Sequence, residues 1–282
     1  MLWTSSLNKT NYKLLLIMYR NDLEEYVLFT SLGKDSLGCL GAIEHLGWKL
    51  TRIVHVEVWA TKNVPAELPP MVEFKKKVMQ IIKERYGIEV ECVKSDHTYE
   101  DIFYSRFQKG KKQGIIYGFP FQQGSWCQSR LKFEAINKIK INGIEYIGIA
   151  SDEPERFGTL VNNEKKISPL VELDWQEDLC GLWCKYSDLL SPDYETSCRG
   201  GCWFCHNQGV DQLRHLRKNY PEHWKLLLKW DNDSPVTFKP NGITVHHFDK
   251  RFELEELGLV PTDKTFRWEM LERDFLQVRI LI

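Results

Sequence analysis

Residues 26–36 read YVLFTSLGKDS, and this stretch decides the interpretation of the first half of the chain. Its first five positions are apolar, aromatic or β-branched, which is typical of a buried strand. The next six carry serine, glycine, lysine and aspartate, and apolar residues then recur at helical spacing until Gly47, a typical helix end. The stretch therefore predicts a strand, a tight loop and a helix in direct succession.

The alternation of strands and helices continues beyond this unit. Strand-like runs occupy residues 52–59, 88–93 and 146–150, and helical segments lie between them, including one at 131–139. Units of this length imply parallel strands with helices on both faces of the sheet. The predicted fold class is α/β, a doubly wound and mostly parallel sheet, with its ligand at the carboxyl ends of the strands.

The pattern changes from residue 165. Cysteine and tryptophan become dense, two helical segments follow, and the second begins near Pro221. The sequence KPNGI at residues 239–243 predicts a hairpin turn. We therefore expect an α/β domain over residues 1–164 and a smaller, mainly helical, cysteine-containing appendage over residues 165–282.

Composition excludes several classes of protein. Hydrophobic residues make up 43% and charged residues 27%, as in a soluble globular chain and unlike a disordered one. With a net charge of -1, binding to nucleic acid or membrane needs a local patch. The apolar run at residues 14–18 is too short for a signal peptide or a membrane span. We expect a cytoplasmic protein without a membrane partner.

The loop at residues 31–36 has the chemistry of an anion site. Such a loop turns backbone N–H groups toward the positive end of the helix dipole, which favours phosphate or sulfate. Gly33 allows close backbone approach, Ser31 and Ser36 offer hydroxyls, and Lys34 adds charge. The spacing between glycine and lysine excludes a Walker P-loop. The alternative is a glycine-containing turn with solvated charges, which the flanking strand and helix disfavour.

The loop resembles the SGGKDS motif of PP-loop enzymes, which bind adenine nucleotides and cleave them at the α-phosphate. The sequence departs from the motif at Leu32, where a second glycine is usual. The resemblance implies that Lys34 and Asp35 are catalytic. It also implies that the nucleotide is bound by the whole matching set, Ser31, Gly33, Lys34, Asp35 and Ser36.

Three further segments are similar to the phosphoadenylylsulfate (PAPS) and adenylylsulfate reductases of the same superfamily. They read SWCQSRLK at 125–132, YIGIASDEPER at 146–156 and GCWFC at 201–205. Together with the loop they follow the family's order over residues 25–206. The resemblance places adenine and ribose against two residues of the second strand, His55 and Glu57, and a structural role for both is an equal alternative.

Charged residues of these segments complete the predicted nucleotide site. Arg156 can bind a phosphate or sulfate with two hydrogen bonds, and Lys132 acts as a point charge, so both are candidate catalytic residues that stabilise leaving pyrophosphate or sulfite. Asp152 and Glu153 at a strand end can position Mg²⁺ or orient the ribose. A surface pair of glutamate and arginine is the alternative interpretation.

Five of the eight cysteines fall between residues 180 and 205, which in a reducing compartment indicates metal binding or catalysis. Cys198, Cys202 and Cys205 formally match the radical-SAM spacing, and a haem-attachment motif begins at Cys202, but neither suits the surrounding sequence. The family resemblance adds Cys127 and implies a [4Fe–4S] cluster held by all four. A structural zinc ion, or unligated cysteines in an aromatic core, are the alternatives.

The remaining cysteines have less specific surroundings. Cys180 and Cys184 are four residues apart on a helix predicted over residues 173–186, where they serve as spare ligands or in core packing. Cys39 and Cys92 fall in a helix and a strand of the expected core, and we expect both to be inert.

Two basic stretches, RFQKGKK at 106–112 and RHLRKNYPEHWK at 214–225, mix cations with aromatic residues as nucleic-acid surfaces do. A solvated face is the alternative. Relatives of this fold thiolate tRNA or DNA, so the resemblance makes a nucleic-acid acceptor, or a protein partner, a candidate.

The main functional expectation is a PAPS reductase-like enzyme of the ATP pyrophosphatase type, which binds ATP or a sulfonucleotide with Mg²⁺ in sulfur metabolism. Thioredoxin-linked reductases carry a nucleophilic cysteine in a C-terminal tail, and no cysteine follows Cys205, so we expect a different thiol or adenylate chemistry with sulfur transfer. The alternatives are an ATP-dependent sulfurtransferase that thiolates tRNA or DNA and a non-catalytic nucleotide sensor. The intact lysine, aspartate and serine of the loop argue against the sensor.

Overall fold

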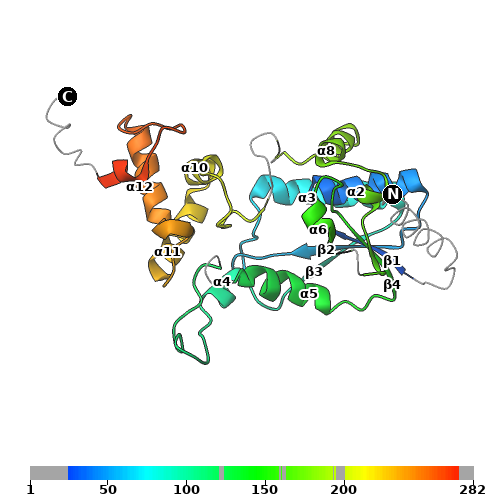
Figure 1. The fold of residues 1–282 in the computed structure, drawn as a ribbon, viewed down its shortest axis with the longest axis horizontal. Helices are drawn as coiled ribbons and strands as arrows, with labels where there is room; N and C mark the ends of the chain where they lie inside the picture. The colour runs from blue at the N-terminus through cyan, green and yellow to red at the C-terminus, as the bar shows by residue number, and fades with distance from the viewer. Residues whose placement is uncertain are drawn as a thin grey trace, which may run out of the picture. The chain divides into compact units, whose positions relative to one another are not determined.

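Five parallel strands form one sheet in the order β3-β2-β1-β4-β5 (Figure 1). The computed structural model describes residues 25–120, 124–158, 160, 163–192, 194 and 201–272. The strands are β1 (Glu25–Thr30), β2 (Arg52–Glu57), β3 (Val90–Lys94), β4 (Gly143–Ile147) and β5 (Lys166–Ile167). β1 is central and pairs with β2 on one side and β4 on the other. The predicted α/β fold is confirmed, with every pair in this sheet parallel.

Helices cover both faces of the sheet. In Figure 1, α2, α3 and α8 lie above the strands and α5 lies below them. The helices of this part are α2 (Lys34–Leu46), α3 (Pro69–Tyr86), α5 (Glu134–Asn137), α6 (Pro154–Gly158), α7 (Pro169–Glu172) and α8 (Glu177–Tyr186). α2 ends at Gly47, whose φ of 63° is left-handed and whose N–H donates to the carbonyl of Glu44 (3.1 Å). The predicted helix end is therefore correct.

The chain divides into two compact units that are interleaved in sequence. The α/β unit contains the described residues of the stretches 1–57, 69–94 and 134–200, and the helical unit those of 58–68, 95–133 and 201–282. The sequence correctly predicted a mainly helical, cysteine-containing C-terminal region. The boundary expected between residues 164 and 165 stays a prediction about domains.

Aromatic side chains fill the core of the helical unit. Trp203 and Trp230 are fully buried and stack at 5.6 Å between ring centroids, and Phe103 and Phe119 pack edge to face at 5.4 Å. The helices around this core are α4 (Tyr99–Phe103), η2 (Gln128–Phe133), α10 (Val210–Asn219), α11 (Pro221–Asp233), η3 (Pro240–Gly242), α12 (Val245–Glu256) and η4 (Trp268–Glu272). None of the helices in the described ranges is long and apolar enough to span a bilayer.

Three local predictions need correction. The helix expected at 131–139 is a π-helical turn, η2, followed by the short α5. The helix expected from residue 173 begins at Glu177, because Asp174 has a left-handed φ of 55° and interrupts it. Residues 239–243 do turn, with Asn241 at φ 61°, but they lead into α12 and form no hairpin, since Thr244 caps that helix.

Candidate functional site

The loop after β1 lies where the strand order of the sheet reverses direction. β1 is followed along the chain by β2 on one side, whereas β4 lies on its other side, and ligands of open α/β sheets bind at such a switch point. Gly148 follows β4, and a Cβ there would lie 2.8 Å from the Cα of Ser36. A glycine at this position thus lets the end of β4 approach the start of α2. An isolated glycine between two isoleucines was the available sequence signal.

Leu32 takes the left-handed conformation for which a second glycine would be suited. Its φ is 57° and its N–H donates to the hydroxyl of Thr30 (2.9 Å). A left-handed leucine costs roughly 1–2 kcal/mol. The side chain is fully buried in the core, however, and burying a leucine contributes about 1.5–3 kcal/mol. Burial therefore offsets the backbone strain, and the loop keeps its turn despite the departure from SGGKDS.

Hydroxyl groups connect the two ends of the loop. The hydroxyl of Ser36 donates to the carbonyl of Gly33 (3.0 Å) and lies 3.2 Å from that of Ser31. Gly33 is the N-cap of α2 and has no side chain to cap the helix. The first N–H groups of a helix without such a cap form a ready site for an anion.

Lys34 is held between two carboxylates. Its ammonium lies 2.5 Å from Glu177 and 3.0 Å from Asp35, and its backbone N–H donates to the hydroxyl of Tyr194 (3.3 Å). Burial lowers the pKa of Lys34, but the hydrogen bonds and charges of Glu177 and Asp35 outweigh it and raise the pKa above the ordinary value. Lys34 is therefore a permanent cation at neutral pH. Sequence reasoning missed Glu177 and Tyr194, because no local pattern links them to the loop.

Carboxylates gather on the same edge. Burial raises the pKa of Asp35, Lys34 opposes the rise, and the charges of Glu177 and Glu153 add to it. Asp152 accepts from the backbone N–H of Glu177 (3.2 Å) and so caps the start of α8. Closely spaced carboxylates suit Mg²⁺. Within the described ranges, though, no three His, Cys, Asp or Glu side chains are positioned to hold an ion.

Arg156 is paired with a neighbouring carboxylate. Its guanidinium lies 2.5 Å from Glu153, three residues earlier in the chain, and its side chain is 57% exposed. This is the surface pair named above as the alternative interpretation. A phosphate role for Arg156 stays a prediction that requires the guanidinium to leave Glu153.

The two candidate residues of β2 differ. His55 is buried, with Nδ1 2.9 Å from the carbonyl of Thr30 and Nε2 3.1 Å from the ammonium of Lys75, so its ring serves the core. Glu57 ends β2 and, after burial, is a further cause of the raised pKa of Cys92. Cys92 itself is exposed, which corrects its expected place in the core, because β3 is an edge strand.

Three cysteines lie at the packing of α2 on α8. Cys39, Cys180 and Cys184 are fully buried, and the thiol of Cys184 donates to the carbonyl of Lys34 (3.4 Å). Burial raises the pKa of both Cys180 and Cys184 to about 12, so they are protonated thiols at neutral pH. Core packing is confirmed as the role of the pair on α8.

The other predicted cysteines lie in the helical unit. Burial raises the pKa of Cys202 to about 12, Lys132 opposes the rise, and the charges of Cys205 and Cys127 are among the groups that add to it. The backbone N–H of Cys205 donates to the carbonyl of Cys202 (3.0 Å), closing the CxxC turn. The fourth predicted ligand, Cys198, falls outside the described residues. The structure thus brings three of the four cysteines and Lys132 into one neighbourhood.

A buried hydroxyl provides a test of whether a sulfur-ligated group fits there. Tyr99 is 1% exposed, its hydroxyl has no hydrogen-bond partner in the described part of the chain, and its ring lies 4.1 Å from that of Phe204. Burial raises its pKa, and the charges of Cys127, Cys205 and Cys202 add to the rise. An unsatisfied buried hydroxyl costs about 1–3 kcal/mol. A donor beside three cysteines suits sulfur that carries negative charge, so the chemistry of these residues fits a thiolate-bound group, although in the described ranges the three cysteines are not positioned to hold an ion together.

Lys239 supports the same cysteines from a distant part of the sequence. Its ammonium donates to the carbonyls of His206 (2.8 Å) and Gln208 (2.6 Å), which follow the CxxC turn. Burial lowers the pKa of Lys239, and the charge of Cys205 opposes the decrease. The sequence carried no signal for this contact.

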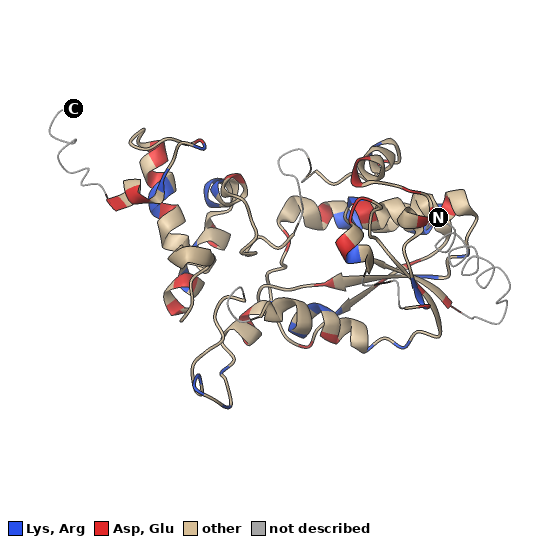
Figure 2. Cartoon of the chain, viewed as in Figure 1, with Lys and Arg blue, Asp and Glu red and all other residues tan. Residues whose placement is uncertain are grey.

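In the second basic stretch, residues 214–225, both arginines and Lys225 are paired with acidic side chains. Figure 2 shows basic and acidic positions side by side on α10 and α12. Its ion pairs are Arg214 with Asp211 and Glu255, Arg217 with Asp249 and Glu256, and Lys225 with Glu222. The two arginines join α10 to α12, which favours the structural interpretation over nucleic-acid binding.

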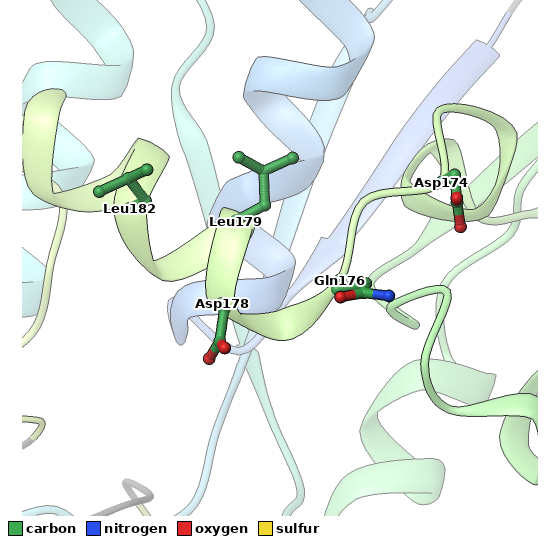
Figure 3. A pocket seen from close by; sticks show the side chains of 5 residues that line it. All are labelled: Asp174, Gln176, Asp178, Leu179 and Leu182. Carbon is green, nitrogen blue, oxygen red and sulfur yellow. The ribbon is translucent and has the colours of Figure 1, made fainter.

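A shallow groove lies on the outer side of α8 (Figure 3). Leu179 and Leu182 project from the same side of the helix and Asp178 from the other. Asp174 and Gln176 complete the lining. The groove contains none of the predicted site residues.

Comparisons with known proteins give little further information. No protein-family profile matches the chain, and no curated protein sequence is similar to it at a significant level. The chain is similar to a solved structure of the U34-tRNA thiolase NcsA from Methanococcus maripaludis with its [4Fe–4S] cluster, at 16% identity and a TM-score of 0.37, over 80% of this chain and 78% of that chain. A TM-score of this size assigns neither fold nor function. The fold is therefore taken from the sheet itself and the chemistry from the site.

Proposed function

We propose that this chain is an ATP-dependent sulfurtransferase of the PP-loop type, which activates an acceptor with the α-phosphate of ATP and then exchanges oxygen for sulfur. The observation that carries the proposal is the loop at residues 31–36. It has a left-handed turn at Leu32, a helix start without an N-cap side chain and a permanent cation at Lys34. These features support binding of a polyphosphate at the carboxyl edge of the sheet.

The binding step exchanges internal partners for those of the nucleotide. Phosphate oxygens would replace the hydroxyl of Tyr194 at the N–H of Lys34 and the carboxylate of Glu177 at its ammonium. Asp35, Glu153 and Asp152 are the candidate residues to hold Mg²⁺, which would neutralise the phosphates. Ser31 and Ser36 would donate hydroxyl hydrogen bonds from the loop.

The proposed reaction consists of two successive nucleophilic displacements. An acceptor oxygen attacks the α-phosphorus, the bond to the bridging oxygen of pyrophosphate breaks, and pyrophosphate leaves. A sulfur nucleophile then attacks the activated carbon, and AMP leaves with the original acceptor oxygen. Lys34 stabilises the developing charge on pyrophosphate, with Arg156 as a second predicted cation.

The cysteines of the helical unit would supply the sulfur chemistry. Cys127, Cys202 and Cys205, with Cys198 as the sequence predicts, would hold a [4Fe–4S] cluster, and zinc is the alternative. Such a cluster supplies iron that binds sulfur and exchanges electrons. Lys132 would place positive charge beside it.

Sulfur transfer has more support than sulfonucleotide reduction. A reductase requires a thiolate that attacks the sulfonyl sulfur. The cysteines packed near the loop, Cys180 and Cys184, are buried thiols with pKa values of about 12. Thiols of this kind are poor nucleophiles at neutral pH.

The test combines calorimetry with product analysis. The protein is given ATP, Mg²⁺, a sulfide source and total tRNA, and pyrophosphate, AMP and sulfur in the RNA are measured. Lys34→Ala should abolish nucleotide binding and turnover. Lys185→Ala, which removes an exposed lysine of α8, should change neither.

Three results would contradict the proposal. Equal nucleotide affinity in the protein and in Lys34→Ala would remove the phosphate site. Sulfite release from a sulfonucleotide without pyrophosphate would identify a reductase. Nucleotide binding with no turnover under any condition would identify a sensor.

A further inference from the structure

We propose that the basic hairpin, residues 105–117, binds the sugar-phosphate backbone of a nucleic acid. The inference rests on the proposed function and deepens it by giving the chemical class of the acceptor. It depends on charge and geometry within the helical unit alone.

The charge around the hairpin is one-sided. Between residues 102 and 133 the chain has no Asp or Glu, although the whole chain has 39 of them against 38 Lys and Arg. The same segment carries Arg106, Lys109, Lys111, Lys112, Arg130 and Lys132. A nearly neutral protein therefore concentrates positive charge in one segment, and a local positive patch of this kind attracts polyanions.

The hairpin has a defined, hydrogen-bonded backbone conformation. Arg106 and Ile116 form an antiparallel bridge, and the backbone N–H of Phe107 donates to the carbonyl of Ile115 (3.0 Å). Gly110 has a left-handed φ of 81°, which turns the chain at the tip. The tip lysines are consequently presented to solvent on a defined backbone, and Figure 2 shows basic positions without acidic ones there.

Three of the hairpin cations, Arg106, Lys109 and Lys111, keep their charge available. The guanidinium of Arg106 donates to the carbonyl of Gly114, a neutral acceptor. Among the described residues, Arg106, Lys109 and Lys111 form no ion pair. This is the opposite of the stretch at 214–225, where the arginines are matched by carboxylates. Both stretches mix cations with aromatic residues, and the carboxylate partners of the second one separate them.

Aromatic rings accompany these cations. Phe107 and Tyr117, on opposite arms of the hairpin, lie 4.4 Å apart between centroids, and the ammonium of Lys112 lies 5.7 Å from the ring of Phe107. Rings beside cations are the composition of surfaces that bind single-stranded or looped nucleic acid.

The hairpin is anchored to the cysteine segment. The indole N–H of Trp126 donates to the carbonyl of Gly118 (3.1 Å), directly after the second arm of the hairpin. Cys127 is the next residue, and the exposed Arg130 and Lys132 follow it. A backbone bound along the hairpin would thus continue toward the cysteines from which we propose that sulfur is supplied.

The experiment measures binding of fluorescently labelled total tRNA, and of duplex DNA in a second arm, by anisotropy between 50 and 200 mM salt. The double variant Lys109→Gln, Lys111→Gln should bind tRNA about tenfold more weakly, and its log–log salt slope should fall by about two. The matched control, Lys218→Gln with Lys225→Gln, removes two exposed lysines from the other stretch and should stay within about twofold of the unmodified protein.

The outcomes separate this inference from the proposed function. Unchanged affinity and slope in the hairpin variant, or an equal loss in the control, would overturn the inference. Preference for the DNA arm would keep the hairpin as the binding element and assign the acceptor to DNA. ATP affinity by calorimetry should be the same in the hairpin variant as in the unmodified protein. Failure of the hairpin test would therefore leave the proposed nucleotide site standing, and failure of the Lys34→Ala test would leave the proposed nucleic-acid surface standing.

Discussion

Three cysteines pack between α2 and α8 of the α/β unit, and three others lie beside the aromatic core of the helical unit. Burial raises the pKa of Cys184 in the first group and of Cys202 in the second to the same value, about 12. Burial alone therefore does not distinguish a packing cysteine from a candidate ligand. A lysine lies near each group, Lys34 near the first and Lys132 near the second, so the difference among the described residues is the unpartnered hydroxyl of Tyr99 beside the second group.

The largest effect is expected from Cys202→Ser. Purified without oxygen, the unmodified protein should hold about four iron atoms per chain, and the variant should lose them because a thiolate ligand is removed. Cys184→Ala is the matched control and should keep its metal, with a modest loss of stability from the small cavity. The iron and zinc contents of the unmodified protein and the two variants are measured by elemental analysis. Retention by Cys202→Ser, or equal loss in both variants, would place the metal elsewhere, and one zinc per chain would make the site structural.

Gly41→Ala tests the packing role of the first group. A Cβ at Gly41 would lie 2.3 Å from the ring of Trp183 on α8, so either the ring or the helix must shift. We expect a loss of about 1–3 kcal/mol in the free energy of unfolding. Gly181→Ala, also within a helix, meets nothing closer than 3.9 Å and should stabilise by about 0.5–1 kcal/mol. Urea unfolding measures both, and equal stabilities would contradict tight packing of α2 on α8.

Tyr99→Phe tests whether the hydroxyl of Tyr99 contributes to metal binding by the second group of cysteines. The ring remains in the aromatic core, and only the hydroxyl donor is lost. Loss of a hydrogen bond to a metal-bound sulfur should weaken metal retention about tenfold against a chelator and lower the midpoint potential of an iron–sulfur cluster. Tyr104→Phe, whose hydroxyl donates to Asp233 instead (2.5 Å), should change neither quantity. If the two variants behave alike, Tyr99 serves packing only.

The smallest effect is expected from Glu177→Gln, on the α8 side of the nucleotide loop. The change removes a carboxylate from the ammonium of Lys34 and leaves the cation available to phosphate. An ion pair that is partly exposed contributes up to about 1 kcal/mol, so ATP should bind up to about fivefold more tightly. Asp178→Asn, on the exposed side of the same helix, should leave the affinity unchanged. Weaker ATP binding by Glu177→Gln would instead make Glu177 part of the Mg²⁺ site.

Local patterns determined the parts of the fold that local physics controls. The apolar run before the loop, the helical spacing after it and Gly47 together specify a strand, a turn and a helix. Prediction failed where a single backbone conformation decided the outcome, as at Asp174, which delays the start of α8, and at Asn241, which turns the chain without a second strand. A left-handed residue other than glycine leaves no periodic signal in a sequence.

The sequence by itself determined the α/β class, the place of the loop after the first strand and the clustering of cysteines for which we propose a metal. Only the tertiary structure decided which partners these residues have. Glu177 reaches Lys34 across 143 positions of sequence, and folding brings the carboxylates of Asp249 and Glu255 to the arginines of the second basic stretch. The physical reason is that periodicity and turn chemistry act between near neighbours, whereas burial, ion pairing and the pKa values that follow from them depend on which distant segments pack together.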